Sequence, residues 1–194
     1  MGITRRQFNQ AIEDCGFSAP SSEVYEYFNS QTSSFSLNEL AMFLAQLIHE
    51  SAGFRYKEEI AYAGRRNHGQ YRDHCSLPGK DYHGRGYIQL TWAANYRDAS
   101  RDLGMGDELL RNPERVANET KLAMRVSVWY WTERVRPQLG GRYDCFGKTT
   151  KAINGAIECS GGYNSVAAKR YQYYLKVADA LGVQNKASER GCYN

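Results

Sequence analysis

Apolar residues recur every three or four positions along most of the chain, which is the spacing of one face of an α-helix. The pattern predicts seven helical segments. They begin near residues 4, 21 or 22, 36, 91, 118, 149 and 164, and four of them end at the glycines at 16, 53, 104 and 182. Thr4 with Gln7, and Ser36 with Glu39, have the spacing of capping boxes. The sequence therefore predicts a mainly α-helical fold.

The stretch from Gly53 to about Tyr87 has no helical stripe and is rich in glycine, charge and histidine. Loops of this length inside a compact domain are usually functional or disordered. The sequence YIQL at Tyr87–Leu90 is typical of a short strand. There is no internal repeat, low-complexity segment or Pro-rich linker, so we expect residues 1–194 to form one domain with a small β element.

Composition excludes several classes of function. The chain is 42% hydrophobic and 24% charged, and no apolar run approaches the roughly 18 residues of a membrane helix. The net charge of +4 is mild and the basic residues are scattered, so we expect neither a nucleic-acid partner nor a membrane partner. The 15 tyrosines suit carbohydrate binding and core packing equally. Trp129 and Trp131 lie at helical spacing beside Val126, which favours core positions.

An acidic residue continues the apolar face of the third segment, FLAQLIHESAGF (residues 43–54). Phe43, Leu47, Glu50 and Phe54 follow the spacing i, i+4, i+7, i+11, so Glu50 lies along the stripe. Loss of water around a carboxyl group raises its pKa, and a carboxylic acid still protonated near neutral pH can act as a general acid. The alternative is a glutamate that turns to water at a fraying helix end.

The pair His49-Glu50 also begins the H-E-x-x-H motif of zinc peptidases, but position 53 is glycine. The four histidines, at 49, 68, 74 and 83, show no H-x3-H spacing, and the cysteines show no C-x2-C spacing. We therefore expect no metal site, and we interpret His49 as structural or exposed.

General acid catalysis of glycoside hydrolysis requires a second carboxyl group. Glu58 and Glu59 lie just beyond Gly53, and the nine positions from Glu50 to Glu59 can cross a cleft. Two carboxyl groups about 6.5–9.5 Å apart leave room for a water and predict inversion, whereas about 5 Å predicts retention. Sequence spacing does not measure that gap or choose between the two glutamates.

Further motifs follow in the sequence: YHGRGYIQLTWAANY (82–96), INGAIEC (153–159), AAKRYQYYLKVADALGV (167–183) and GCYN (191–194). With FLAQLIHESAGF they resemble, in the same order, the motifs of glycoside hydrolase family 19 chitinases: F-x-A-Q-x-x-H-E-[TS]-x-G, Y-x-G-R-G-x-I-Q-L-[ST]-x-x-x-N-Y and I-N-G-x-x-E-C. The resemblance runs from about Phe43 to the C-terminus. No single motif is specific for the family, but the set of motifs in this order is. Bacterial and phage endolysins related to this family share much of the pattern.

The resemblance implies a bilobal, lysozyme-like α-helical fold with a cleft between the lobes. It implies that Glu50 is the general acid and Glu59 the general base of an inverting enzyme. It further implies that five polar residues bind the substrate, hold the water or pair with the catalytic carboxylates. These are Gln89, Thr91, Asn95, Asn154 and Arg170.

Each of these residues also has a plainer interpretation. Thr91 has the position of a helix cap, Asn154 with Gly155 is typical of a turn, and Arg170 on a helix is usually a solvated charge. Arg85 in HGRG is interpreted as structural.

The five cysteines leave the redox compartment open. Two disulfides and one free thiol fit an oxidising compartment, whereas five reduced thiols fit a cytosol. The resemblance pairs Cys159 with Cys192, and we expect a second bridge between Cys15 and Cys75, which leaves Cys145 without a partner. The bridges favour a secreted protein, although the first ten residues lack the apolar region of a secretory signal.

Three functions are compatible with these features. The first is an endo-acting chitinase that hydrolyses β-1,4-linked N-acetylglucosamine polymers with inversion. The second is an endolysin that cleaves peptidoglycan, and the third is an inactive chitin-binding protein. For the first we expect chitin or a chitooligosaccharide as the partner, a monomer, and no cofactor, because water is the only co-substrate. Ala93-Ala94 replaces a bulkier pair of the plant members, which predicts a more open cleft wall.

Overall fold

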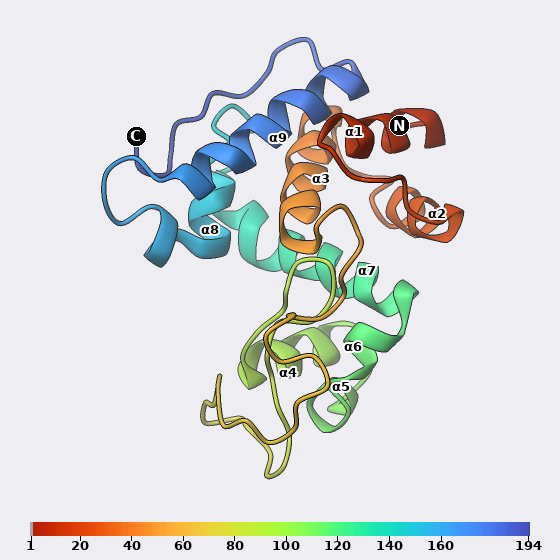
Figure 1. The fold of residues 1–194 in the computed structure, drawn as a ribbon, viewed down its shortest axis with the longest axis vertical. Coiled ribbons are helices and arrows are strands. Elements are labelled where there is room, and N and C mark those ends of the chain that lie inside the picture. Colours follow the sequence, from red (N-terminus) through yellow and green to blue (C-terminus); the bar gives the residue numbers. More distant parts are fainter. Residues whose placement is uncertain (1) are drawn as a thin grey trace.

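A computed structural model describes residues 2–194, so residue 1 of the expected domain lies outside the described residues. The chain is mostly helical (Figure 1). The elements are α1 (Arg5–Asp14), α2 (Ser22–Gln31), α3 (Leu37–Ser51), α4 (Ala93–Asp102), α5 (Glu108–Arg111), α6 (Arg115–Asn118), α7 (Thr120–Tyr130), the π-helix η1 (Trp131–Val135), the 3-10 helix η2 (Arg136–Leu139), α8 (Gly147–Glu158) and α9 (Ser165–Leu181). The predicted mainly α-helical class is confirmed.

Two hydrophobic cores divide the molecule into two lobes. The larger core joins α1, α2, α3 and α9 with η1, and we call this part the large lobe. The smaller core joins α4, α5 and α6 with residues of the irregular segment, and we call it the small lobe. Helix α7 contributes Ala123 and Met124 to the first core and Leu122 and Val126 to the second, so it connects the lobes. In Figure 1 the small lobe lies below the large one.

Helix α3 is the central element of the large lobe, with α9 beside it in Figure 1 and α1 packed against α9. Every residue from Glu39 to Ile48 is buried, which is expected of a helix that is apolar on nearly all sides. Ser36 caps its N-terminus through the backbone N–H of Glu39. The Glu39 carboxylate does not close the expected capping box, because it accepts hydrogen bonds from Trp131 Nε1 at 2.9 Å and Arg136 Nε at 2.7 Å. The box between Thr4 and Gln7 is confirmed.

The expected strand at Tyr87–Leu90 is wrong, since these residues form a turn. Gln89 has a φ of +59° and Gly86 a φ of +78°, which an extended strand does not allow. Residues 2–194 contain isolated bridges rather than a sheet, and Arg85 pairs with both Glu58 and Leu90. The irregular segment is thus tied to the turn by backbone contacts at Arg85.

One of the two expected disulfides is present. Cys159 and Cys192 are bonded, as the resemblance to the family implied. The bridge between Cys15 and Cys75 is wrong, and both are free thiols. Cys15 is buried in the large lobe, where burial raises the pKa of its thiol to about 12, whereas Cys75 packs against the core of the small lobe. The two sulfur atoms therefore belong to different cores. Cys145 is also free.

The buried positions expected for Trp129 and Trp131 are confirmed, with 5% and 0% of their surfaces exposed. None of the described helices combines the length and the apolar character needed to cross a bilayer.

The single disulfide should make a measurable contribution to stability. It joins residues 33 positions apart, and closing a loop of that size reduces the entropy of the unfolded chain. We expect the double variant Cys159→Ser/Cys192→Ser to lose about 3–4 kcal/mol of unfolding free energy in urea titrations. The single variant Cys145→Ser serves as the control for loss of a thiol. An equal loss in both proteins would contradict a stabilising role of the bridge.

Candidate active site

A cavity of about 580 Å³ lies between the two lobes and contains all seven residues that the sequence analysis assigned to catalysis or substrate binding. The large lobe supplies one wall through α3, α8 and α9, and the small lobe supplies the other through the irregular segment and α4. The seven residues are Glu50, Asn154 and Arg170 on the first wall, and Glu59, Gln89, Thr91 and Asn95 on the second.

Glu50 lies in the last turn of α3 and meets the cavity from a largely buried position. Its side chain is 16% exposed, and its Oε1 accepts a hydrogen bond from Arg170 Nη1 at 2.6 Å. Burial raises the pKa of the Glu50 carboxyl, and the opposing effect of Arg170 does not cancel it. Glu158, a second carboxylate nearby, adds to the rise. The prediction that the Glu50 carboxyl lies along the apolar face of α3, largely shielded from water, is therefore confirmed.

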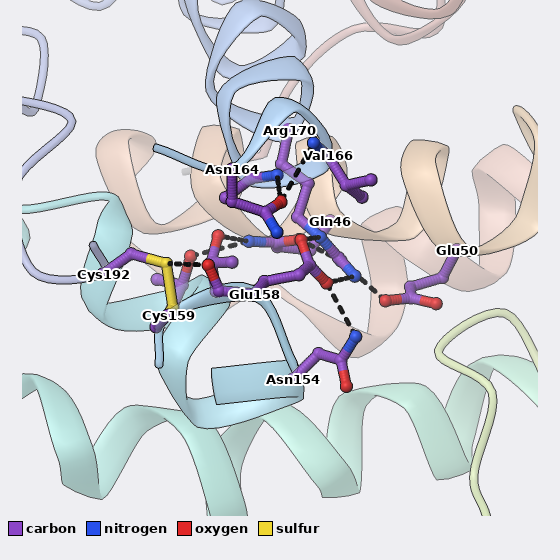
Figure 2. A network of polar contacts seen from close by, with 12 residues as sticks. Gln46, Glu50, Asn154, Glu158, Cys159, Asn164, Val166, Arg170 and Cys192 are labelled. Carbon is purple, nitrogen blue, oxygen red and sulfur yellow. Dashed lines mark hydrogen bonds and ion pairs between the residues drawn. A yellow bond between two sulfur atoms is a disulfide. The ribbon is translucent and has the colours of Figure 1, made fainter. Parts of the chain in front are cut away.

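Arg170 is 2% exposed, so its interpretation as a solvated charge is wrong. Its Nε and Nη2 donate to the two carboxylate oxygens of Glu158 at 2.9 and 2.7 Å, which is a bidentate pair. Its Nη1 donates to Gln46 Oε1 at 2.8 Å as well as to Glu50 (Figure 2). One guanidinium is thus shared by two carboxyl groups from α3 and α8.

The shared guanidinium of Arg170 explains why the pKa values of Glu50 and Glu158 shift in opposite directions. Burial alone would raise the pKa of Glu158, but the hydrogen bonds from Arg170 and Asn154 hold it below its usual range. Asn154 Nδ2 donates to Glu158 Oε2 at 2.7 Å. An ionised Glu158 neutralises Arg170, so little of the positive charge remains to ionise Glu50. The cluster is electrically balanced when Glu50 carries its proton.

Local backbone features aim these side chains at the cavity. Helix α3 ends directly after Glu50, where Ala52 and Gly53 adopt φ values of +50° and +68°. A Cβ atom on Gly53 would lie 2.5 Å from the Cβ of Phe17, so a glycine is required there. In α8 the backbone of Asn154 is non-helical, with φ −146° and ψ 36°. The break falls at the Asn154-Gly155 pair, whose plainer interpretation was a turn.

Glu59 faces the cavity from the opposite wall. Its Oε1 accepts a hydrogen bond from the Tyr71 hydroxyl at 3.1 Å, and its Oε2 accepts one from the backbone N–H of Gly84 at 3.1 Å. Glu58 points elsewhere, since it pairs with His83 at 2.8 Å and lines a second cavity of about 520 Å³. The structure therefore brings Glu59, and not Glu58, into the space shared with Glu50.

The turn before α4 carries the other polar residues of this wall. Thr91 Oγ1 donates to Gln89 O at 2.8 Å, and Asn95 Nδ2 donates to Thr91 O at 2.8 Å. Thr91 does not cap α4, because Trp92 occupies the N-cap position with a φ of +77°. Each side chain has a polar atom oriented by the backbone of its neighbour, which holds the wall in a fixed arrangement.

Sequence reasoning missed several residues of the site. Glu158 lies inside the INGAIEC motif and Gln46 inside FLAQLIHESAGF, but nothing in their spacing reveals a shared arginine. Trp92 is 46% exposed on the cavity wall and meets Tyr71 edge to face at 5.5 Å. The two tryptophans named from the sequence, Trp129 and Trp131, are buried, whereas the exposed Trp92 stands beside Thr91. Ile157, also on the wall, is 73% exposed.

Three possible metal ligands lie together in a turn of the small lobe, at Asp73, His74 and Cys75. Both carboxylate oxygens of Asp73 already accept backbone hydrogen bonds, from Cys75 N at 2.8 Å and Ala94 N at 2.9 Å. The Cys75 sulfur accepts one from Arg97 Nη1 at 2.8 Å. These contacts explain the cluster as a turn that anchors α4, and the Arg97 cation opposes a metal ion there.

Because Arg170 is buried between two carboxyl groups, replacing it should destabilise the protein much more than replacing an exposed arginine. Arg170→Met leaves the buried carboxylate of Glu158 without its partner, which should cost about 3–5 kcal/mol in urea unfolding at neutral pH. Arg142→Met, which breaks an exposed pair with Asp144, should leave the midpoint nearly unchanged. Equal midpoints for the two variants would contradict the proposed charge balance.

Comparisons with known proteins agree with the motifs and with the fold. The family described as "Chitinase class I", glycoside hydrolase family 19, matches residues 17–141. An endochitinase of Arabidopsis thaliana is 38% identical over 197 residues, which cover 93% of this chain and 65% of that protein. The chain spans between about half and two thirds of the length of the curated relatives it matches first.

Two solved structures have the same fold over nearly their whole length. Chitinase C from Streptomyces griseus superimposes with a TM-score of 0.80 at 28% identity, covering 96% of this chain and 95% of that one. A family 19, class IV chitinase from Zea mays gives a TM-score of 0.74 at 26% identity, covering 94% of each chain. The motifs, the matched family and these structures together establish that the chain belongs to the chitinases of glycoside hydrolase family 19.

Proposed function

We propose that the cleft hydrolyses β-1,4-linked N-acetylglucosamine polymers by an inverting, endo-acting mechanism. The proposal rests above all on one observation: a carboxyl with a raised pKa, Glu50, and a second carboxyl outside its charge cluster, Glu59, line opposite walls of one cavity. Paired carboxyls with different environments are what glycoside hydrolysis requires. The relatives are described as endochitinases and chitinases, which supports chitin as the substrate class.

In this proposal Glu50 gives its proton to the glycosidic oxygen as the bond to the anomeric carbon breaks. Glu59 takes a proton from a water that attacks that carbon from the opposite face. Glu50 becomes an anion at this moment, and Arg170 at 2.6 Å stabilises it. The same guanidinium therefore assists more strongly in the transition state than before the reaction. Solvent then returns one proton to Glu50 and removes one from Glu59.

The remaining wall residues have roles that follow from their chemistry. Thr91 and Asn95 carry hydroxyl and amide groups that line the same cavity as Glu59, and the resemblance to the family assigns them to the water and the substrate N-acetyl group. Trp92 offers an exposed aromatic face, which suits stacking on a sugar ring. Asn154 has an amide oxygen left for a sugar, since its nitrogen is held by Glu158.

We further propose that the two lobes act as one catalytic domain in a secreted, monomeric protein. The cavity takes residues from both lobes, so neither lobe has a complete site alone. The Cys159–Cys192 bridge favours an oxidising compartment.

Chitin hexamer followed by proton NMR tests the reaction and its stereochemistry together. We expect internal cleavage with the α-anomer as the first product, because water attacks opposite the β-linked leaving group. Retained β-anomer would contradict the inverting mechanism. Release of reducing ends from bacterial cell walls, but not from the hexamer, would instead identify peptidoglycan as the substrate.

The same assay assigns the two carboxyls. Glu50→Gln and Glu59→Gln should each lower kcat by about 10²–10⁴-fold, which is the usual contribution of a positioned acid or base. Glu58→Gln should be less damaged than Glu59→Gln, and the exposed Glu133→Gln provides the control. Greater damage in Glu58→Gln than in Glu59→Gln would transfer the base assignment to Glu58.

Glu50→Gln should also separate stability from activity. Because the folded-state pKa of Glu50 is raised, ionising it costs stability as pH rises from the unfolded pKa through the folded pKa. The glutamine variant avoids this cost, so at pH 7–8 it should melt at or above the wild-type Tm, and its advantage should shrink toward pH 4. A lower Tm for the variant at pH 8 would mean that Glu50 is a stabilising carboxylate.

A further inference from the structure

Glu58, next to the proposed base in sequence, ends a chain of hydrogen bonds through two histidines. His83 Nε2 lies 2.8 Å from Glu58 Oε1, and His83 Nδ1 lies 2.9 Å from His68 Nε2. His68 Nδ1 in turn accepts the backbone N–H of Gln70 at 3.1 Å. We call these four groups the histidine relay. The ring of Tyr62 lies against both histidines, with centroids 4.3 and 5.7 Å away.

The contacts determine the tautomer of each ring. A backbone N–H is always a donor, so His68 Nδ1 must be an acceptor and its proton must be on Nε2. That proton points to His83 Nδ1, which is therefore an acceptor as well. His83 then carries its proton on Nε2 and donates it to Glu58. All three bonds of the relay exist together only when both histidines are neutral.

The relay is adjacent in sequence to Glu59 and to the two groups that donate hydrogen bonds to its carboxylate. Glu59 accepts hydrogen bonds from Tyr71 and from the backbone of Gly84. Each of these three residues directly follows a relay member in the sequence. The preceding members are Glu58, Gln70 and His83. Tyr62 adds a contact, since its ring meets Tyr71 edge to face at 5.8 Å.

We propose that the histidine relay is a positioning device that holds Tyr71 and Gly84 on Glu59, and that protonation of either histidine releases them. A proton on His68 Nδ1 would face the N–H of Gln70, and a proton on His83 Nδ1 would face the N–H of His68. Either event breaks one bond of the relay. This inference rests on the proposed role of Glu59 as the base, and it adds a control of that site by pH.

Burial and Arg85 favour neutral His83, whereas the carboxylates of Glu58 and Asp81 beside the two rings favour protonation. Burial lowers the pKa of His83, and Arg85 contributes to the decrease, although the hydrogen bond to Glu58 opposes it. Arg85 Nε lies 3.6 Å from Glu58, which keeps that carboxylate partly neutralised. Asp81 Oδ1 lies 3.7 Å from His68 Nε2 and is the one carboxylate near that ring, apart from Glu58 at the other end of the relay. Tyr62 is the other ionisable side chain packed on both rings.

The tautomers can be tested without any substrate. Imidazole ¹⁵N NMR spectra of the full chain at pH 7.5 should show both His68 and His83 as neutral Nε2–H tautomers with Nδ1 accepting a hydrogen bond. A proton on Nδ1 of either ring, or a cation at this pH, would overturn the relay. Because this readout does not depend on hydrolysis, it remains decisive even if the protein does not cleave chitin.

The link to Glu59 is tested by pH profiles of kcat/KM on chitin hexamer. His68→Gln keeps an N–H donor toward His83 but no longer titrates, so the acid limb, scaled to its own maximum, should move to lower pH. His74→Gln, which changes an exposed histidine outside the relay, should leave the limb in place. An identical limb in wild type and His68→Gln would overturn the proposal, whereas an inactive wild type would instead overturn the proposed function.

A second pair of variants distinguishes positioning from mere stability. His83→Leu removes the two hydrogen bonds that His83 makes, to Glu58 and to His68. We expect kcat to fall by about 10- to 100-fold with little change in KM, because Glu59 loses its orientation while the sugar contacts remain. His83→Gln restores a donor toward Glu58 and should recover part of kcat. Equal losses of kcat in the two variants, matched by equal losses of Tm, would show a structural role only.

Discussion

The ion cluster in which Arg170 bridges Glu50 and Glu158 is the interaction on which the site depends. The Arg170 guanidinium faces two carboxyl groups in a largely buried environment. The net charge of these three groups is therefore zero when only one carboxyl is ionised. The bidentate geometry and the amide of Asn154 assign that charge to Glu158. The proton is left on Glu50, which is the carboxyl that meets the cavity.

The fold supplies this cluster by crossing three helices. Helix α3 brings Glu50 and Gln46, α8 brings Glu158, and α9 brings Arg170 into one buried place. The base side has a different construction, because Glu59 lies in an irregular segment that polar contacts hold in place. Fine control of its position must therefore come from hydrogen bonds, which is the physical reason that a titrating relay can act on it.

Sequence patterns predicted the helices and the carboxyl pair for clear physical reasons. A stripe of period 3.6 and a capping residue are local features, and the interruption of the α3 stripe by Glu50 is visible in the same way. The resemblance to family 19 then selected seven residues, and all of them line the cavity. The expected Cys15–Cys75 bridge failed because pairing depends on which core each sulfur joins, and the Tyr87–Leu90 strand failed because Gln89 takes a left-handed turn. Neither fact is encoded in residue spacing, and the same holds for the burial of Arg170.

The central claim is that the pKa of the Glu50 carboxyl lies above its ordinary value, whereas the pKa of the Glu158 carboxyl lies below it. A ¹³C NMR titration of the side-chain carboxyl groups, with Glu50→Gln and Glu158→Gln used for assignment, measures both in one experiment. The account predicts a Glu50 pKa above the ordinary value of 4.5 and a Glu158 pKa below it. A Glu50 carboxyl that titrates at or below 4.5 in the wild-type protein would contradict the account.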